Sequence, residues 1–225
     1  FRALIYLSFA VVITWPAVLG LGASIPGAER TDTWNSYWAI HHVADQLRSG
    51  HSIFISESLN FPHGGPLIVN DPLGSLIALP FAILFGTAVA FSLLVLFQLS
   101  FAGWCMHSFT SALLAQRTPH EAPRWGPWIS GFGLMLSPLL VSHIHNGATE
   151  ALSVGWTILA IWMSWRFMHL CTLRSAMIAG LCLMMAAMAN WYGGIVAFVF
   201  AMALAVSCNG EGRGRSRTRR WWAVL

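Results

Sequence analysis

Acidic residues are scarce in this chain, and three of them stand at the ends of apolar runs, where a carboxylate can do acid–base chemistry. Asp32 follows the first apolar run, Asp71 precedes a short run before the second, and Glu150 opens a later one. A carboxylate at a membrane edge is partly desolvated, which raises its pKa toward neutral pH and suits it to proton transfer. We therefore interpret Asp32, Asp71 and Glu150 as candidate catalytic groups.

Each of these acids also has a structural interpretation. Asp32 can cap the helix that follows it, and Asp71, directly before Pro72, can cap the next one. Glu150 falls in the first turn of a helix, where the helix dipole favours negative charge. The sequence leaves both interpretations open at all three positions.

The residues after Asp32 form an amphipathic pattern that suits a membrane surface. With Asp32 or Thr33 as the cap and Gly50 as the stop, this pattern predicts a helix from Trp34 to about Ser49. One stripe of this helix is apolar, and the neighbouring face carries aromatic, His and charged side chains. The candidate binding residues of this segment are Glu29, Arg30, Trp34, Trp38, His41, His42 and Arg48.

Two short polar turns supply the remaining candidate binding residues. The turn SHIHNG carries His143 and His145, and the turn NWYGG carries Asn190, Trp191 and Tyr192. The aromatic pair can stack on a ring-shaped ligand or anchor the chain at the membrane interface. Two His residues alone do not make a zinc site. We assign no metal ligands and leave a divalent metal cofactor open.

The elements that must position these residues are membrane helices. The chain is 56% hydrophobic and 9% charged, with a mean hydropathy of +0.64. Apolar runs of about 18 residues or more recur, each long enough to cross a bilayer core of about 30 Å. We predict an all-α polytopic membrane protein with one transmembrane domain over 1–225. Because the chain starts at Phe1 and ends in RRWWAVL, we expect it to be part of a longer protein.

About six transmembrane helices and two interfacial helices are predicted. The run from Asp71 to Gly86 is only about 22 Å long as a helix, too short to span. If it lies in the interface, the Arg residues between the spans fall on one side, which the positive-inside rule makes cytoplasmic. We expect a bacterial inner membrane location, with both termini cytoplasmic and the candidate site outside. The predicted spans are about 3–22, 88–115, 125–142, 148–165, 175–189 and 191–208, and the outer loop 23–87 holds interfacial helices at about 34–49 and 72–86.

The sequence lacks the motifs that mark several classes of enzyme. The chain has no phosphate-binding Gly loop, no nucleophile elbow and no HExxH. Its charge of +4 comes mainly from Arg residues near the C-terminus, which we interpret as a topology signal and not as a nucleic-acid surface. The four Cys residues fit no metal spacing and are expected to be packing thiols.

The order of motifs resembles the N-terminal half of GT-C glycosyltransferases, which are multi-spanning enzymes that use polyprenyl-phosphate sugars. The similarity comprises a first span, an acid beyond it, an aromatic surface helix ending in SG, the segment FPHGG, and a Pro-led helix closing in LFG. SPLLVSHIHNGATEALSVGW and ANWYGG also resemble segments of uncharacterised bacterial members of that class.

This resemblance implies sugar transfer on the periplasmic side, with an acid of the first loop at the active site. Asp32 matches that acid best, and Glu29 is its rival. Arg30 and Arg48 are the outer-side Arg residues and hence the available partners for a departing phosphate. The implied partners are membrane lipid and a polyprenyl-phosphate sugar.

Two other functions stay open. One is a transporter of a lipid-linked or small solute, although ionisable residues cluster at the outer edge and not in mid-span. The other is a non-catalytic subunit that anchors a larger complex through its outer loop. If the helices pack as a bundle around the outer loop, Asp32 and at least one other acid should face a common pocket within roughly 12 Å.

Overall fold

The computed structural model describes residues 1–29, 31–58, 62–66, 71–117 and 125–210, and they are mostly helical. A short hairpin pairs β1 (Ile55–Ser56) with β2 (Gly65–Pro66), and a 3-10 turn, η1, covers Ala17–Gly20. The helices are α1 (Arg2–Ile13), α2 (Thr33–Ser49), α3 (Pro72–Phe85), α4 (Thr87–Arg117), α5 (Gly126–Met135), α6 (Pro138–Asn146), α7 (Thr149–Leu152), α8 (Val154–Leu170), α9 (Leu173–Ala189) and α10 (Trp191–Gly210).

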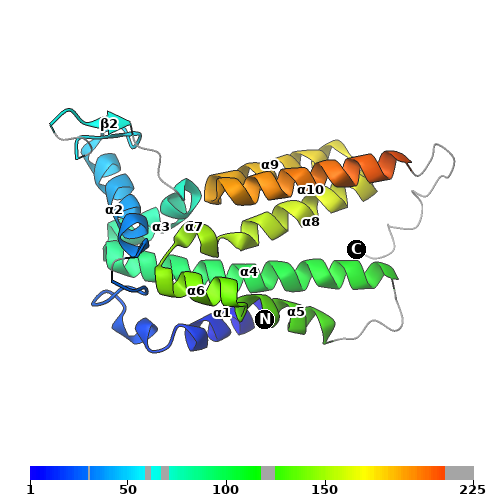
Figure 1. Cartoon of the computed structure of the whole chain (residues 1–225), viewed down its shortest axis with the longest axis horizontal. Coiled ribbons are helices and arrows are strands. Elements are labelled where there is room, and N and C mark those ends of the chain that lie inside the picture. The colour runs from blue at the N-terminus through cyan, green and yellow to red at the C-terminus, as the bar shows by residue number, and fades with distance from the viewer. Residues whose placement is uncertain (30, 59–61, 67–70, 118–124, 211–225) are drawn as a thin grey trace.

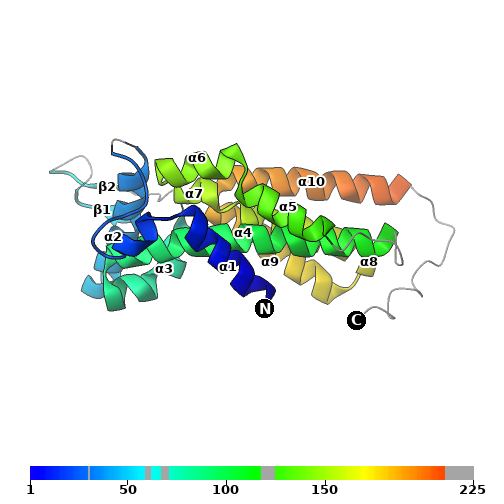
Figure 2. The same ribbon diagram turned by 90° about the horizontal axis from the view of Figure 1, so that it is seen from below.

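The long helix α4 lies at the centre of an elongated bundle (Figure 1). Helices α8, α9 and α10 pack together on one side of α4, and α1 and α5 pack on the other. Two views at right angles place α2 and the hairpin at the same end of the bundle (Figures 1 and 2). We call this the α2 end; the α6–α7 turn and the junction of α9 with α10 also face it.

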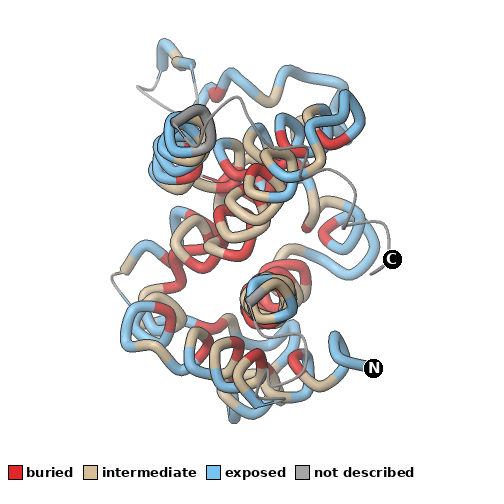
Figure 3. Tube along the Cα trace, turned by 90° about the vertical axis from the view of Figure 1, so that its right-hand side faces the viewer, coloured by how far each residue is buried: buried red, intermediate tan, exposed pale blue. Residues whose placement is uncertain are grey.

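The core forms where the other helices meet α4. Buried residues line the inward faces of the helices, while exposed residues cover the outside (Figure 3). Phe91, Leu94 and Leu99 of α4 are at most 2% exposed. His107 of α4 is buried, and its Nδ1 lies 3.0 Å from the Tyr6 hydroxyl. A polar pair inside an apolar bundle keeps both groups satisfied.

The two helices predicted for the outer loop are confirmed as helices. Helix α2 covers Thr33–Ser49 and ends at Gly50, which adopts the left-handed conformation with φ 70°. Helix α3 covers Pro72–Phe85 and ends before Gly86. Proline is favoured in the first helical turn because its missing N–H has no helical acceptor there.

Three predicted spans differ from the helices of the structure in where a helix ends or breaks. Helix α1 ends at Ile13 instead of near residue 22, because Pro16 cannot donate a backbone hydrogen bond and the chain turns through η1. The predicted span 125–142 corresponds to the apolar segment Gly126–Asn146, which is divided into α5 and α6 because Ser137 caps α6 and Pro138 occupies its first position. The predicted span 148–165 is likewise divided, at Ser153, into α7 and α8.

Helix length supports fewer membrane crossings than the six predicted. Within the described ranges, two helical segments are long and apolar enough to cross a membrane, Thr87–Gln116 and Gly126–Asn146. Four shorter apolar helices are also present: Arg2–Ile13, Pro72–Phe85, Leu173–Ala189 and Trp191–Ser207.

Candidate functional site

Asp71 is a buried carboxyl group where α3 meets α4. Its side chain is 4% exposed, and its Oδ1 accepts a 2.7 Å hydrogen bond from the Gly74 N–H, which caps α3. Gln98 of α4 donates from Nε2 to Asp71 Oδ2 at 3.0 Å. Asp71 therefore fulfils the capping role, but its second oxygen is held by a different helix.

Burial raises the pKa of Asp71 to about 7. Hydrogen bonds from Gly74, Gln98 and the Thr149 side chain oppose this rise, because they favour the charged carboxylate. The nearby charge of Glu150 raises the pKa further, since two negative charges repel. The carboxyl group of Asp71 can therefore exchange a proton near neutral pH.

Glu150 is the second acid at this place. It lies in α7 and is half-buried, and its Oε2 is buried without a hydrogen-bond partner among the described residues. Its backbone carbonyl accepts from Asn190 Nδ2 at 3.0 Å. Two of the three predicted catalytic acids are thus neighbours. We call Asp71, Gln98, Thr149 and Glu150 the carboxyl cluster.

Gln98 was not predicted as a site residue from the sequence. It is 1% exposed, and its Oε1 has no hydrogen-bond partner among the described residues. The available signal was a single Gln in the apolar run FSLLVLFQLSF. A polar side chain in the middle of such an apolar run is uncommon and often functional.

Asp32 is at the α2 end but is exposed. It occupies the N-cap position of α2, yet its side chain makes no capping hydrogen bond. Its neighbour Thr33 donates to the Asn146 carbonyl at 3.1 Å, and Ser36 accepts from the Thr149 N–H at 3.4 Å. The start of α2 is therefore attached to the end of α6 and to the start of α7, the helix that contains Glu150. A pocket shared by Asp32 and a second acid stays a prediction.

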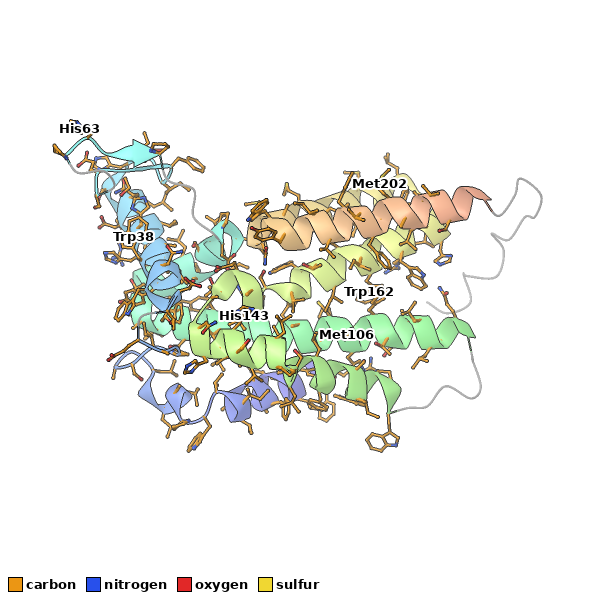
Figure 4. The ribbon with its side chains drawn as sticks, in the orientation of Figure 1. Trp38, His63, Met106, His143, Trp162 and Met202 are labelled. Carbon is orange, nitrogen blue, oxygen red and sulfur yellow. The ribbon has the colours of Figure 1, made fainter. Side chains whose placement is uncertain are left out.

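Some residues of the predicted binding face of α2 are exposed, and others contact neighbouring side chains. Trp34 is 58% exposed, and His41 is also exposed, with its Nδ1 3.4 Å from the Thr87 hydroxyl. Trp38 stacks on the buried ring of His42 at 5.0 Å between ring centroids. Figure 4 shows Trp38 on α2 and His143 on α6 at the same end of the bundle.

The two remaining charged candidates that the structure describes, Arg48 and Glu29, do not join the carboxyl cluster. Arg48 donates from Nη2 to the Ile83 carbonyl at 2.8 Å, so it caps the last turn of α3. Glu29 is exposed, and Arg30 lies outside the described residues.

The two polar turns have different roles. Helix α6 continues through His143 and His145, so their side chains point to different sides. Asn190 caps α10, because its Oδ1 accepts from the N–H of Tyr192 at 3.0 Å. Trp191 and Tyr192 are exposed, with ring centroids 4.0 Å apart. Asn190 therefore links α7 to α10 and leaves the aromatic pair at the surface.

An apolar groove of about 550 Å³ lies between α1, α3 and α4. Its lining contains only apolar side chains apart from Ser100. Residues lining it include Leu4, Leu7, Ile77, Phe81, Phe97 and Trp104.

Among the described residues, no three His, Cys, Asp or Glu side chains gather closely enough to hold a metal ion. The candidate site thus offers two carboxyls supplemented by neutral oxygen donors. No protein-family model, curated protein or solved structure matches this chain.

Proposed function

We propose that the chain is the membrane-embedded part of a GT-C-type glycosyltransferase. It transfers a sugar from a polyprenyl-phosphate donor to an acceptor hydroxyl at the α2 end, on the outer face of a bacterial inner membrane. The observation that carries this proposal is the pair of neighbouring acids, Asp71 and Glu150, at that end.

The length of α4 supports this placement in a bilayer. Its 31 residues extend about 46 Å, which exceeds the bilayer core by about 16 Å. Gln98 lies about 16 Å along the helix from Thr87 and about 28 Å from Arg117. With Arg117 at the inner boundary, the carboxyl cluster lies at the outer boundary, where a lipid-phosphate headgroup resides.

The proposed reaction uses the acids for proton transfer. The bond between the sugar and the donor phosphate breaks, a bond from the sugar to the acceptor oxygen forms, and the acceptor proton passes to a carboxylate of the pair. We place this role at Asp71 and Glu150 instead of Asp32, because Asp32 is exposed and Asp71 is buried beside a second acid. Since Asp71 is 4% exposed, its neighbours must move when substrate enters.

The apolar groove supports a lipid-linked donor. Its α4 wall runs from Leu93 to Trp104 and so passes Gln98 of the cluster. The lining residues Ser100, Phe101 and Trp104 follow Gln98 toward Arg117, which is the side on which the bilayer lies in this placement. A prenyl chain in the groove would keep its apolar surface out of water while its headgroup lies near the cluster.

A transfer assay tests the proposal. The full chain in vesicles is given a polyprenyl-phosphate hexose, and release of free polyprenyl phosphate is measured. We expect Asp71→Asn to lower the rate by about 10²–10⁴-fold, the usual contribution of a general base. Asp45→Asn removes an exposed carboxylate of α2 and should leave the rate unchanged. Equal rates for Asp71→Asn and wild type would contradict the proposal.

A second experiment tests the orientation of α4 across the membrane that the proposal requires. Single Cys residues at positions 87 and 117, at the two ends of α4, are labelled from outside in intact cells after the native Cys residues are replaced. We expect labelling at position 87 and none at position 117. The reverse pattern would contradict the proposed orientation.

A further inference from the structure

The carboxyl cluster contains two buried oxygen atoms with unmet hydrogen-bonding capacity. Among the described residues, neither Gln98 Oε1 nor Glu150 Oε2 has a hydrogen-bond partner. Gln98 is 1% exposed, and its amide is in direct contact with Asp71. Buried oxygens without partners are costly, so a missing positive partner would stabilise them.

The charge balance of the cluster points the same way. Glu150, whose charge raises the pKa of Asp71, is also negative. Two neighbouring carboxyl groups in a desolvated place can both be ionised only beside a compensating positive group, and otherwise one of them keeps its proton. All donors that the cluster can offer to such a group are oxygens: two carboxylates, the Gln98 carbonyl and the Thr149 hydroxyl.

We propose that the carboxyl cluster binds a divalent, oxygen-preferring cation such as Mg²⁺ through Asp71, Gln98, Thr149 and Glu150. Carboxylate, amide and hydroxyl oxygens are the ligands that hard cations prefer. This donor set comes from three segments of the chain, so the ion would fasten the start of α3 to α4 and α7.

The spacing between Asp71 and Gln98 suits this ion. A half-turn of the Gln98 amide exchanges two groups of nearly equal shape and brings Oε1 to the position of Nε2, 3.0 Å from Asp71 Oδ2. Adjacent oxygens around an octahedral Mg²⁺ ion, each bound at 2.0–2.1 Å, are about 3 Å apart. The cation then occupies the place between two acceptors that would otherwise repel.

Direct binding measurements test the site without the proposed sugar-transfer reaction, so either idea can fail alone. The full chain in a non-ionic detergent is titrated calorimetrically with Mg²⁺ and, separately, with Ca²⁺. We expect one of the two ions to bind with a Kd of about 10⁻³ M or tighter. If neither ion binds in that range, water and not a cation occupies the cluster, and the inference is overturned.

Two substitutions of Gln98 locate the ion. Gln98→Leu removes the neutral oxygen ligand and should weaken binding at least about tenfold. Gln98→Glu keeps the size of the side chain and adds a third carboxylate, so it should tighten binding. If Gln98→Leu fails to fold, cation binding by Gln98→Glu provides the test. Asp45→Asn is the matched control and should bind as wild type. Unchanged or weaker binding by Gln98→Glu would overturn the assignment.

Discussion

Gln98 Nε2 donates a 3.0 Å hydrogen bond to Asp71 Oδ2 and so joins the middle of α4 to the residue that begins α3. The other oxygen of the same carboxyl group caps α3 through the Gly74 N–H. One side chain thus fixes both the start of a helix and its packing against the central helix. Both bonds are buried, so each matters more than a comparable bond at the surface.

Replacement of Gln98 tests this link in the metal-free protein. Above pH 7, where the Asp71 carboxyl group is ionised, we expect Gln98→Leu to lower the free energy of unfolding by about 1.5–3 kcal/mol, the range for hydrogen bonds to charged groups. Thermal unfolding of the full chain in detergent with EDTA measures the change. Gln116→Leu is the matched control on the same helix, because Gln116 is not buried. An equal effect of the two substitutions would show that the bond to Asp71 contributes nothing specific.

The stability should depend on pH through Asp71. Burial raises its pKa in the folded chain to about 7 from 3.8, so between these pH values the folded state binds more protons than the unfolded state. The free energy of unfolding should therefore fall as pH rises from about 4 to about 7. Unfolding measured in EDTA across this range checks the sign.

Asp71→Asn supplies the control for this pH dependence. Asparagine caps a helix nearly as well as aspartate, and Gln98 can turn its amide to accept from the new side-chain amide. The variant should fold, and its stability should change less between pH 4 and pH 7 than that of wild type. An undiminished slope would assign the pH dependence to another group.

The sequence predicted helices at most of the correct places because apolar length and turn chemistry are local properties. The break between α9 and α10 falls at Asn190, and α2 ends at Gly50, as the residue types indicate. The internal break of the span 125–142 was also local, since Ser137 and Pro138 signal a helix start. The residues around Ser137 and Pro138 form a continuous apolar run, so the whole segment was predicted as one span.

The candidate site was less accessible to prediction because it depends on tertiary contacts. Asp71 and Glu150 were identified from their positions at helix starts, but nothing local indicates that they are neighbours. Gln98 contacts Asp71 only because α3 packs against α4. Asp32 had the better sequence argument, yet the fold leaves it exposed.

The attachment of α2 to the α6–α7 turn can be tested at Gly147. This residue has φ 62°, and a Cβ added there would collide with Thr33. Gly50 has a similar φ of 70° but open space around it. Gly50→Ala should cost only the left-handed backbone penalty of about 1–2 kcal/mol. Gly147→Ala should cost more, because Thr33 must also shift. Equal losses in unfolding experiments would show that the turn accommodates the methyl group freely.

The role of Asp32 can be separated from helix capping by comparing two N-cap residues. Ser137 accepts a hydrogen bond from the Leu140 N–H at the start of α6, whereas Asp32 makes no such bond at the start of α2. Replacing a bonded cap with Ala costs about 1 kcal/mol. Ser137→Ala should therefore show this loss, and Asp32→Ala should lose clearly less. If Asp32→Ala also retains sugar transfer, its carboxylate is neither a cap nor a base. A loss of transfer without a loss of stability would instead return the catalytic role to Asp32, as its position in the sequence first indicated.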